Sequence, residues 1–147
     1  MRGTSSASSM VQNSAMAKLR HLAITVPDPE KAAEFYIKVF GLRRVGTTEW
    51  DGASGVYLTD GVMNLALLRY KKEEYAGKRG RGYVGAHHFG FIVDDVASTR
   101  AAIEAAGGSH WMGEPDAGGG FYEVKYHDPD GGAFDITARG WTGAAKD

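Results

Sequence analysis

The sequence predicts an α+β fold built from two tandem βαβββ modules, because one pattern occurs in it twice. His21-Leu-Ala-Ile-Thr-Val and His88-Phe-Gly-Phe-Ile-Val each begin with a histidine and alternate in character. Asp28 follows the first histidine at the same distance as Asp95 follows the second. Alternation with a period of two is typical of strands. Each module therefore begins with a strand that carries its histidine on the smaller, more polar face.

A helix is predicted after each of these strands. The first runs from an N-cap at Asp28 to a stop at Gly41, and the second from an N-cap at Asp95 to a stop at Gly107. Apolar residues recur between these limits at helical spacing. We expect the apolar strand face to pack on the helix, which leaves the histidine face pointing toward a cavity.

Three short strand candidates follow each helix and complete the βαβββ pattern. They are residues 43–48, 56–59 and 63–70 in the first copy, and 111–113, 121–127 and 133–138 in the second. The predicted organisation is a disordered N-terminal tail (1–16), a single domain (17–141) and a C-terminal tail (142–147). Within the domain, module one covers 17–70, a linker covers 71–86 and module two covers 87–141.

Composition excludes several classes of partner and ligand. The 147 residues carry 17 basic and 18 acidic side chains, a net charge of −1, so no nucleic acid or membrane partner is expected. The chain has no cysteine, so any metal must be held by nitrogen and oxygen ligands. The absence of cysteine also suits a cytoplasmic location, which we expect.

Two histidines and one aspartate are the candidate metal ligands: His21, His88 and Asp135. Asp135 lies inside the final predicted strand, between apolar neighbours. A buried carboxylate without a partner is very costly, and a metal ion would be such a partner. The alternative is a salt bridge from Asp135 to Arg139 or Arg20.

The chain resembles the vicinal oxygen chelate superfamily, which groups glyoxalases, bleomycin-resistance proteins and extradiol dioxygenases. Four segments carry the resemblance: His21-Leu-Ala-Ile-Thr-Val-Pro-Asp, Phe35-Tyr-Ile-Lys-Val-Phe-Gly-Leu, His88-Phe-Gly-Phe-Ile-Val-Asp-Asp and Asp128-Pro-Asp-Gly-Gly-Ala-Phe-Asp-Ile. The resemblance implies paired modules that form a curved mixed sheet around a metal-binding cup, with helices on the outer face. It also implies metal ligands at His21, His88, Asp135 and one position in the strand 63–68.

The chain departs from the family pattern at two ligand positions. Asp135 stands where a glutamate is usual, and Ala66, or Leu65 after a one-residue shift, stands at the fourth position. Asn64 on the face of Ala66 could offer only a weak carbonyl ligand. Two histidines and one carboxylate with open positions suit Fe²⁺ and oxygen chemistry of the extradiol type. Glyoxalase-like chemistry with Ni²⁺, Zn²⁺, Co²⁺ or Mn²⁺ stays open, because water can fill the fourth place.

Glu123, Lys125 and His127 share one face of the strand 121–127 and are the candidate catalytic residues. The resemblance implies that Lys125 faces the metal, where it could bind a substrate carboxylate or stabilise an enolate. Glu123 or His127 could then move a proton. The alternative is a Glu–Lys pair on a solvated face. Alternation places His87 on the face opposite to His88, in a structural or supporting role.

These residues predict a metal-dependent enzyme that chelates two neighbouring oxygens of a small substrate, as an extradiol-like dioxygenase or a glyoxalase-like lyase or isomerase. The rival is a metal-free protein that binds a small molecule or sequesters a drug, with Trp50, Trp111 and Trp141 as stacking surface. The expected partner is a small oxygenated substrate, whose anionic or aromatic character stays open. The resemblance also implies a homodimer.

Overall fold

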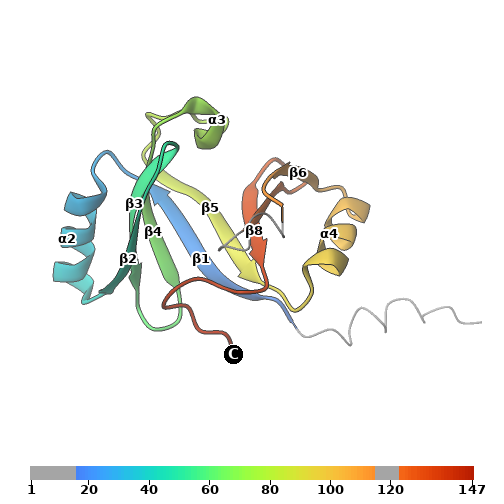
Figure 1. Ribbon diagram of the computed structural model, residues 1–147, viewed down its shortest axis with the longest axis horizontal. Helices are drawn as coiled ribbons and strands as arrows, with labels where there is room; N and C mark the ends of the chain where they lie inside the picture. Colours follow the sequence, from blue (N-terminus) through green and yellow to red (C-terminus); the bar gives the residue numbers. More distant parts are fainter. Residues whose placement is uncertain (1–15, 115–122) are drawn as a thin grey trace, which may run out of the picture.

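The computed structural model describes residues 16–114 and 123–147, and it contains one mixed eight-stranded sheet with α-helices beside it (Figure 1). The first module comprises β1 (Lys18–Thr25), α2 (Pro29–Phe40), β2 (Arg43–Glu49), β3 (Ala53–Thr59) and β4 (Asn64–Tyr70). A short helix α3 (Glu73–Ala76) follows. The second module comprises β5 (Gly85–Ile92), α4 (Val96–Ala105), β6 (Ser109–Met112), β7 (Val124–His127) and β8 (Ala133–Thr137). The predicted N-terminal tail lies outside the described residues except for Met16.

The strand order is β2-β3-β4-β1-β5-β8-β7-β6, so the two modules meet at the centre of the sheet. Within each module the first and last strands pair in parallel, β1 with β4 and β5 with β8. The modules join through an antiparallel pairing of β1 with β5. The predicted α+β class and the two βαβββ modules are confirmed. The first strands of the two modules, β1 and β5, are the two middle strands of the sheet.

The ends of the helices follow the predicted local chemistry. Asp28 accepts hydrogen bonds from the backbone N–H groups of Glu30 and Lys31, and Gly41 ends α2 with a left-handed backbone at φ 71°. Asp95 caps α4 through the N–H of Ser98. Figure 1 shows α2 and α4 on opposite outer sides of the molecule, each next to its own module.

Apolar residues pack on both faces of the first module's sheet. On the helix side, Ala33 of α2 meets Val56, Leu58 and Leu67. On the other side, a second cluster contains the small residues Ala23, Ala53, Ala66 and Ala76, the last from α3, together with the larger Leu68 and Tyr70 of β4. The apolar face of the first strand therefore packs on α2, as predicted. The face that carries the histidine is also well buried, whereas the sequence predicted an open cavity there.

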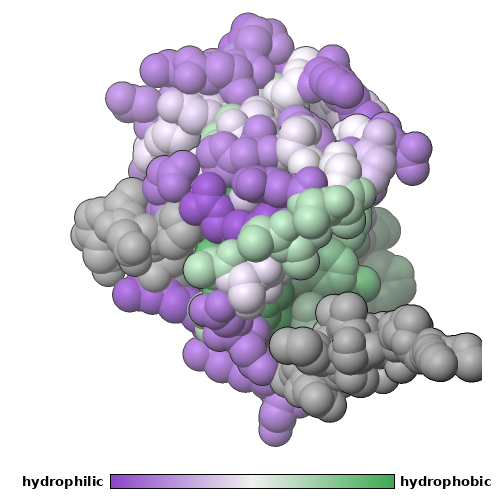
Figure 2. All heavy atoms as spheres, turned by 90° about the vertical axis from the view of Figure 1, so that its right-hand side faces the viewer, coloured by the Kyte–Doolittle hydropathy of each residue, from purple (hydrophilic) through white to green (hydrophobic). Residues whose placement is uncertain are grey.

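The second module's helix covers its sheet less completely. A third cluster, around Val124, Tyr126 and Ile136, packs partly against Ile103 of α4, but no residue of α4 is itself buried. Figure 2 views the molecule from the side on which α4 lies, where a band of weakly hydrophobic surface runs between hydrophilic regions. None of the helices in the described part of the chain is long and apolar enough to cross a membrane.

Several boundaries differ from the sequence prediction. β3 starts at Ala53, three residues before the predicted strand 56–59, and a Cβ at Gly55 within it would lie 2.5 Å from Leu68 Cδ2. The predicted linker contains α3, and β5 already begins at Gly85. Residues 121–122 of the predicted strand 121–127 lie outside the described part, and β7 begins at Val124.

The predicted C-terminal tail packs along the ends of β1 and the β3–β4 turn. The side chain of Arg20 donates to the carbonyls of Ala145 and Asp147, and Thr59 donates to the carbonyl of Gly143. The N–H of Ala145 donates to the carbonyl of Val62. The last residues of the chain are therefore part of the packed structure next to the first strand.

Candidate metal centre

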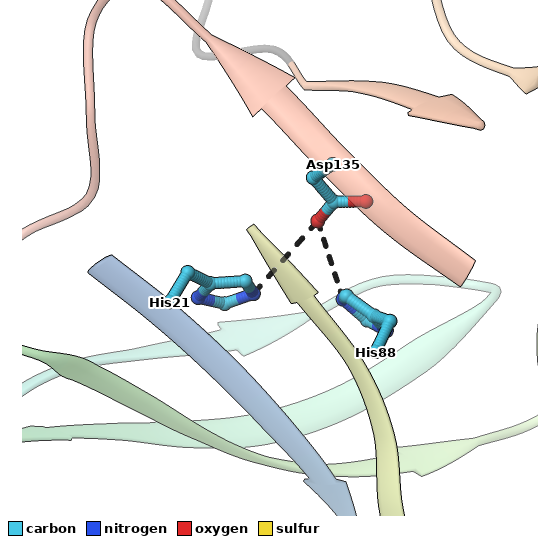
Figure 3. A group of neighbouring side chains, drawn as sticks. All are labelled: His21, His88 and Asp135. Carbon is cyan, nitrogen blue, oxygen red and sulfur yellow. Dashed lines mark ion pairs between the residues drawn. The ribbon is translucent and has the colours of Figure 1, made fainter. Parts of the chain in front are cut away.

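His21, His88 and Asp135 converge from three neighbouring strands, β1, β5 and β8 (Figure 3). The register explains how: Gly90 of β5 pairs with His21 on one side and with Asp135 on the other. His88 is two residues before Gly90 on the same strand, so its side chain projects on the same face. All three candidate ligands are buried, with relative exposures of 2%, 4% and 1%.

The three side chains present one nitrogen or oxygen atom each to a common point. His88 Nε2 lies 3.2 Å from Asp135 Oδ2, and His21 Nε2 lies 3.8 Å from the same oxygen. One ligand atom from each of the three lies within 4.8 Å of the other two. Nitrogen and oxygen ligands of a first-row divalent ion stand about 2.0–2.2 Å from it, so atoms on one ion are separated by about 3–4 Å. The two distances to Asp135 Oδ2 lie within this range, as expected for ligands of a single ion.

The two oxygens of Asp135 have different surroundings. Oδ1 accepts a hydrogen bond of 2.9 Å from Lys125 Nζ, whereas Oδ2 is buried and has no hydrogen-bond partner among the described residues. The 3.2 Å approach of His88 Nε2 to Oδ2 is therefore a close contact without the geometry of a hydrogen bond. A buried carboxylate oxygen without a donor is costly, and a cation at this point would satisfy it.

Among the described residues, the salt bridge of Asp135 with a lysine or arginine is with neither Arg139 nor Arg20, the two predicted alternatives. Its basic partner is Lys125, which stands directly opposite on β7. Burial acts to lower the pKa of Lys125, but the charges of Asp135 and Glu123 outweigh it and raise that pKa. Burial acts to raise the pKa of Asp135, but Lys125 and His88 outweigh it and hold that pKa below its usual range. The pair is therefore ionised at neutral pH.

Glu123 lies beside the same pair at the end of β7. Its Oε1 is 3.6 Å from Lys125 Nζ, and its Oε2 is 4.0 Å from His21 Nε2. Burial and the charge of Asp135 raise the pKa of Glu123. Glu123 and Lys125 are about one fifth exposed. The alternative of a Glu–Lys pair on a solvated face is wrong, since both side chains point into the cup.

Trp141 closes one side of the site. Its indole stacks on the ring of His21, with centroids 4.5 Å apart and an interplanar angle of 6°, and its Nε1–H donates to Glu123 Oε2 at 2.6 Å. A Cβ at Gly90 would lie 2.6 Å from the indole, so glycine is what lets the ring lie on the strand. Because Trp141 is 6% exposed, it is not a free surface for stacking a drug.

Asn64 and His87 contact the two candidate ligand histidines through the ring nitrogen that faces away from Asp135. His21 Nδ1 is 2.8 Å from Asn64 Oδ1, and His88 Nδ1 is 2.8 Å from His87 Nδ1. The expectation that His87 lies on the opposite face is wrong, because a β-bulge between β1 and β5 places Ala86 and His88 opposite consecutive residues of β1 and leaves His87 unpaired. Asn64 does not act as the weak carbonyl ligand expected, since its oxygen contacts the Nδ1 side of His21.

Burial keeps His21 and His87 neutral. It lowers the pKa of His21 to about 3 and that of His87 to about 4. Neutral imidazole is the form that binds a metal.

The open space over the ligands is a cup of about 110 Å³. Its lining includes three aromatic residues, Trp50, Tyr57 and Tyr70. Burial raises the pKa of Tyr70 to about 12, so its phenol stays protonated. Ala66 lines the cup and is fully buried, so the position at which the family resemblance implies a fourth ligand is occupied by a methyl group.

The third candidate catalytic residue, His127, does not line the cup. Its ring stacks on Trp111 at 4.8 Å, and both line a neighbouring cavity of about 440 Å³. His88 borders both spaces. The structure thus brings together His21, His88, Asp135, Glu123 and Lys125, and it leaves His127 outside.

Sequence reasoning named Asn64, His87 and Trp141 but did not predict their contacts in the site: Asn64 with His21, His87 Nδ1 with His88 Nδ1, and Trp141 with His21. Glycine inside a strand is the signal that could have located Trp141, because Gly90 marks a close approach by another group. No comparable feature of the sequence predicts the β-bulge at His87.

The geometry defines a class of protein with paired βαβββ modules and a two-histidine, one-carboxylate site at their junction. The family model of the glyoxalase/bleomycin resistance protein/dioxygenase superfamily matches residues 18–136. The chain belongs to this superfamily, which confirms the resemblance drawn from its sequence motifs.

Solved structures share the fold at low sequence identity. A variant of Streptomyces coelicolor methylmalonyl-CoA epimerase in complex with 2-nitronate-propionyl-CoA aligns with a TM-score of 0.67 and 24% identity, covering 83% of this chain and 96% of that one. A hypothetical protein of Bacillus halodurans C-125 aligns with a TM-score of 0.67 and 21% identity, covering 83% and 94%. Methylmalonyl-CoA epimerase from Mycobacterium tuberculosis aligns with a TM-score of 0.64 and 19% identity, covering 81% and 85%. The comparison with curated proteins gives no match.

Replacing Lys125 by methionine should destabilise the metal-free protein. The change leaves the buried carboxylate of Asp135 without its basic partner, and breaking such a pair typically costs about 3–5 kcal/mol. Urea unfolding would measure the loss. The double variant Lys125→Met/Asp135→Asn should recover part of it, while the exposed-site control Lys31→Met should change little. A loss below about 1 kcal/mol for Lys125→Met, the value of an exposed pair, would contradict this account.

Proposed function

We propose that the protein is an enzyme that uses a divalent metal held by His21, His88 and Asp135 to chelate two neighbouring oxygens of a small substrate. The observation that carries this proposal is the buried Asp135 Oδ2, which faces two imidazole nitrogens and has no hydrogen-bond donor among the described residues. A bound divalent ion would supply Lewis-acid chemistry to the two substrate oxygens, and Fe²⁺ would add the capacity to react with O₂.

The remaining residues of the cup favour proton transfer. Burial and the charge of Asp135 raise the pKa of Glu123, which is the direction that makes a carboxylate a better proton acceptor. The N–H of Trp141 holds the Glu123 carboxylate at the edge of the cup, next to His21. Lys125 adds a positive charge on the same side, suited to a substrate carboxylate or a developing enolate. This arrangement fits a glyoxalase-like lyase or isomerase.

A ring-cleaving dioxygenase of the extradiol type is the second candidate. Ala66 in place of a fourth ligand favours it, because three protein ligands leave open positions. Anaerobic reconstitution with Fe²⁺, followed by oxygen-uptake measurements on a panel of catechols, separates the two candidates. Tight binding of Ni²⁺ or Zn²⁺ without oxygen uptake on any catechol would remove the dioxygenase.

Metal content tests the proposal against the metal-free binding protein. The purified wild-type chain should contain about one divalent ion per protomer, since its three donors suit one ion. Inductively coupled plasma mass spectrometry measures this content. The double variant His21→Ala/His88→Ala should contain almost none. Equal metal in both proteins, or none in the wild type after incubation with Fe²⁺, Ni²⁺, Zn²⁺, Co²⁺ or Mn²⁺, would favour the metal-free alternative.

Replacing Glu123 by glutamine should abolish proton transfer without loss of metal. Glutamine keeps an oxygen for the Trp141 N–H but cannot accept a proton, and removal of a general base typically costs about 10²–10⁴-fold in rate. Deuterium exchange from solvent into methylmalonyl-CoA and hydroxyacetone, followed by NMR, would measure it. Methylmalonyl-CoA is chosen because an epimerase with this fold is seen in complex with it.

The control for this variant is Glu114→Gln, which changes a carboxylate paired with Arg100 away from the cup. Exchange in Glu123→Gln at the wild-type rate would show that Glu123 is not the base.

We also propose that the protein forms a homodimer. The helix α2 leaves Phe35, Val39 and Phe40 exposed at 52%, 55% and 65%. Exposed apolar groups of this size on one helix favour association. Light scattering should give twice the 15.8 kDa of the chain, and a mass of one chain would contradict the dimer.

A further inference from the structure

We propose that Asn64 and His87 are positioning residues that fix the tautomers of His21 and His88, so that Nε2 of both rings offers a lone pair to a metal. The inference rests on the proposed metal-dependent function. A neutral imidazole carries its proton on one nitrogen only, and the hydrogen bond made by the other nitrogen decides which one is free. Both histidines contact a neighbour through Nδ1 and face Asp135 through Nε2.

The tautomer of His21 follows from the orientation of the Asn64 amide. Asn64 Nδ2 lies 2.9 Å from the carbonyl oxygen of Thr142, which can only accept, so Nδ2 must be the donor there. Asn64 Oδ1 is then the atom 2.8 Å from His21 Nδ1. An amide oxygen can only accept, so His21 carries its proton on Nδ1. Its Nε2 is left with a lone pair directed toward Asp135.

The tautomer of His88 follows from a chain of two hydrogen bonds. His87 Nε2 lies 2.5 Å from the carbonyl oxygen of Ala76 in α3, so it must donate. Neutral His87 then has an unprotonated Nδ1, which can only accept from His88 Nδ1 at 2.8 Å. His88 therefore also carries its proton on Nδ1. The bulge in β5 is what places His87 where it can do this.

These two contacts bear on the unsatisfied oxygen of Asp135. With both protons on Nδ1, neither Nε2 presents a proton to Asp135 Oδ2, which lies 3.2 Å from His88 Nε2 and 3.8 Å from His21 Nε2. With both protons held on Nδ1, three electron-rich atoms face one another, and all three are buried. Such an arrangement is unfavourable without a cation and favourable with one. Asn64 and His87 therefore prepare the site for a metal before the metal binds.

The affinity for Co²⁺ tests the proposal without any substrate. In Asn64→Leu and His87→Phe the acceptor is lost and the side-chain size is roughly kept, so Co²⁺ affinity should fall about 10–100-fold, the usual effect of removing a group behind a metal ligand. Asn64→Asp and His87→Gln keep an acceptor and should bind Co²⁺ nearly as well as the wild type. The affinity is measured by the visible absorption of bound Co²⁺.

Thr59→Val is the matched control for Asn64→Leu. Thr59 also donates to the C-terminal segment, at the carbonyl of Gly143, but it contacts neither histidine. If Thr59→Val weakens Co²⁺ binding as much as Asn64→Leu does, loosening of that segment explains the effect and the proposal is overturned.

Nitrogen NMR of the histidine rings in the metal-free protein reports the tautomers directly. His21 and His88 should both carry the proton on Nδ1 in the wild type, and the proton should move to Nε2 for His21 in Asn64→Leu and for His88 in His87→Phe. A proton on Nε2 in the wild type overturns the proposal. If the wild type shows Nδ1 protonation but binds no Co²⁺, the proposed function fails while the tautomers stand, so the two failures are distinguishable.

Discussion

The site depends on the fact that the two oxygens of Asp135 have different partners. This carboxylate is buried at the centre of the sheet, where an ionised group needs compensation on both oxygens. Lys125 compensates Oδ1 from the neighbouring strand, and the two histidines surround Oδ2 without donating to it. The ion pair thus fixes the position of the carboxylate and leaves one oxygen available to a cation.

The architecture of the sheet creates this constraint. Three adjacent strands from two modules carry the ligands, and the one residue between His21 and Asp135 in the sheet is Gly90. Trp141 lies over that glycine, stacks on His21 and holds Glu123, so a residue close to the C-terminus organises the first and the last ligand strands. A bulky residue at position 90 would displace the indole and with it the Glu123 carboxylate.

The two modules are similar in fold and different in chemistry. Module two supplies a histidine, a carboxylate, a lysine and a glutamate, whereas module one supplies His21 and an apolar, aromatic wall. At Ala66 a methyl group occupies the place where the resemblance implies a fourth ligand, and Asn64 on the same strand supports His21 from behind. The lining of the cup therefore combines the charged Glu123 and Lys125 with the aromatic Trp50, Tyr57 and Tyr70.

The sequence by itself determined the repeated βαβββ modules, the capped helices and the candidate ligands His21, His88 and Asp135, because alternation, N-cap residues and glycine stops are local signals. Through the family resemblance it also placed Lys125 on the face toward the metal site. Only the tertiary structure decided that Asp135 pairs with Lys125 rather than an arginine, that a bulge brings His87 against His88, and that Trp141 covers the site while His127 lies outside it. These contacts join segments far apart in the chain or depend on one unpaired residue between strands. Their energies come from burial and from hydrogen bonds formed only when the sheet assembles, so local patterns do not predict them, apart from Gly90, which marks the close approach of Trp141.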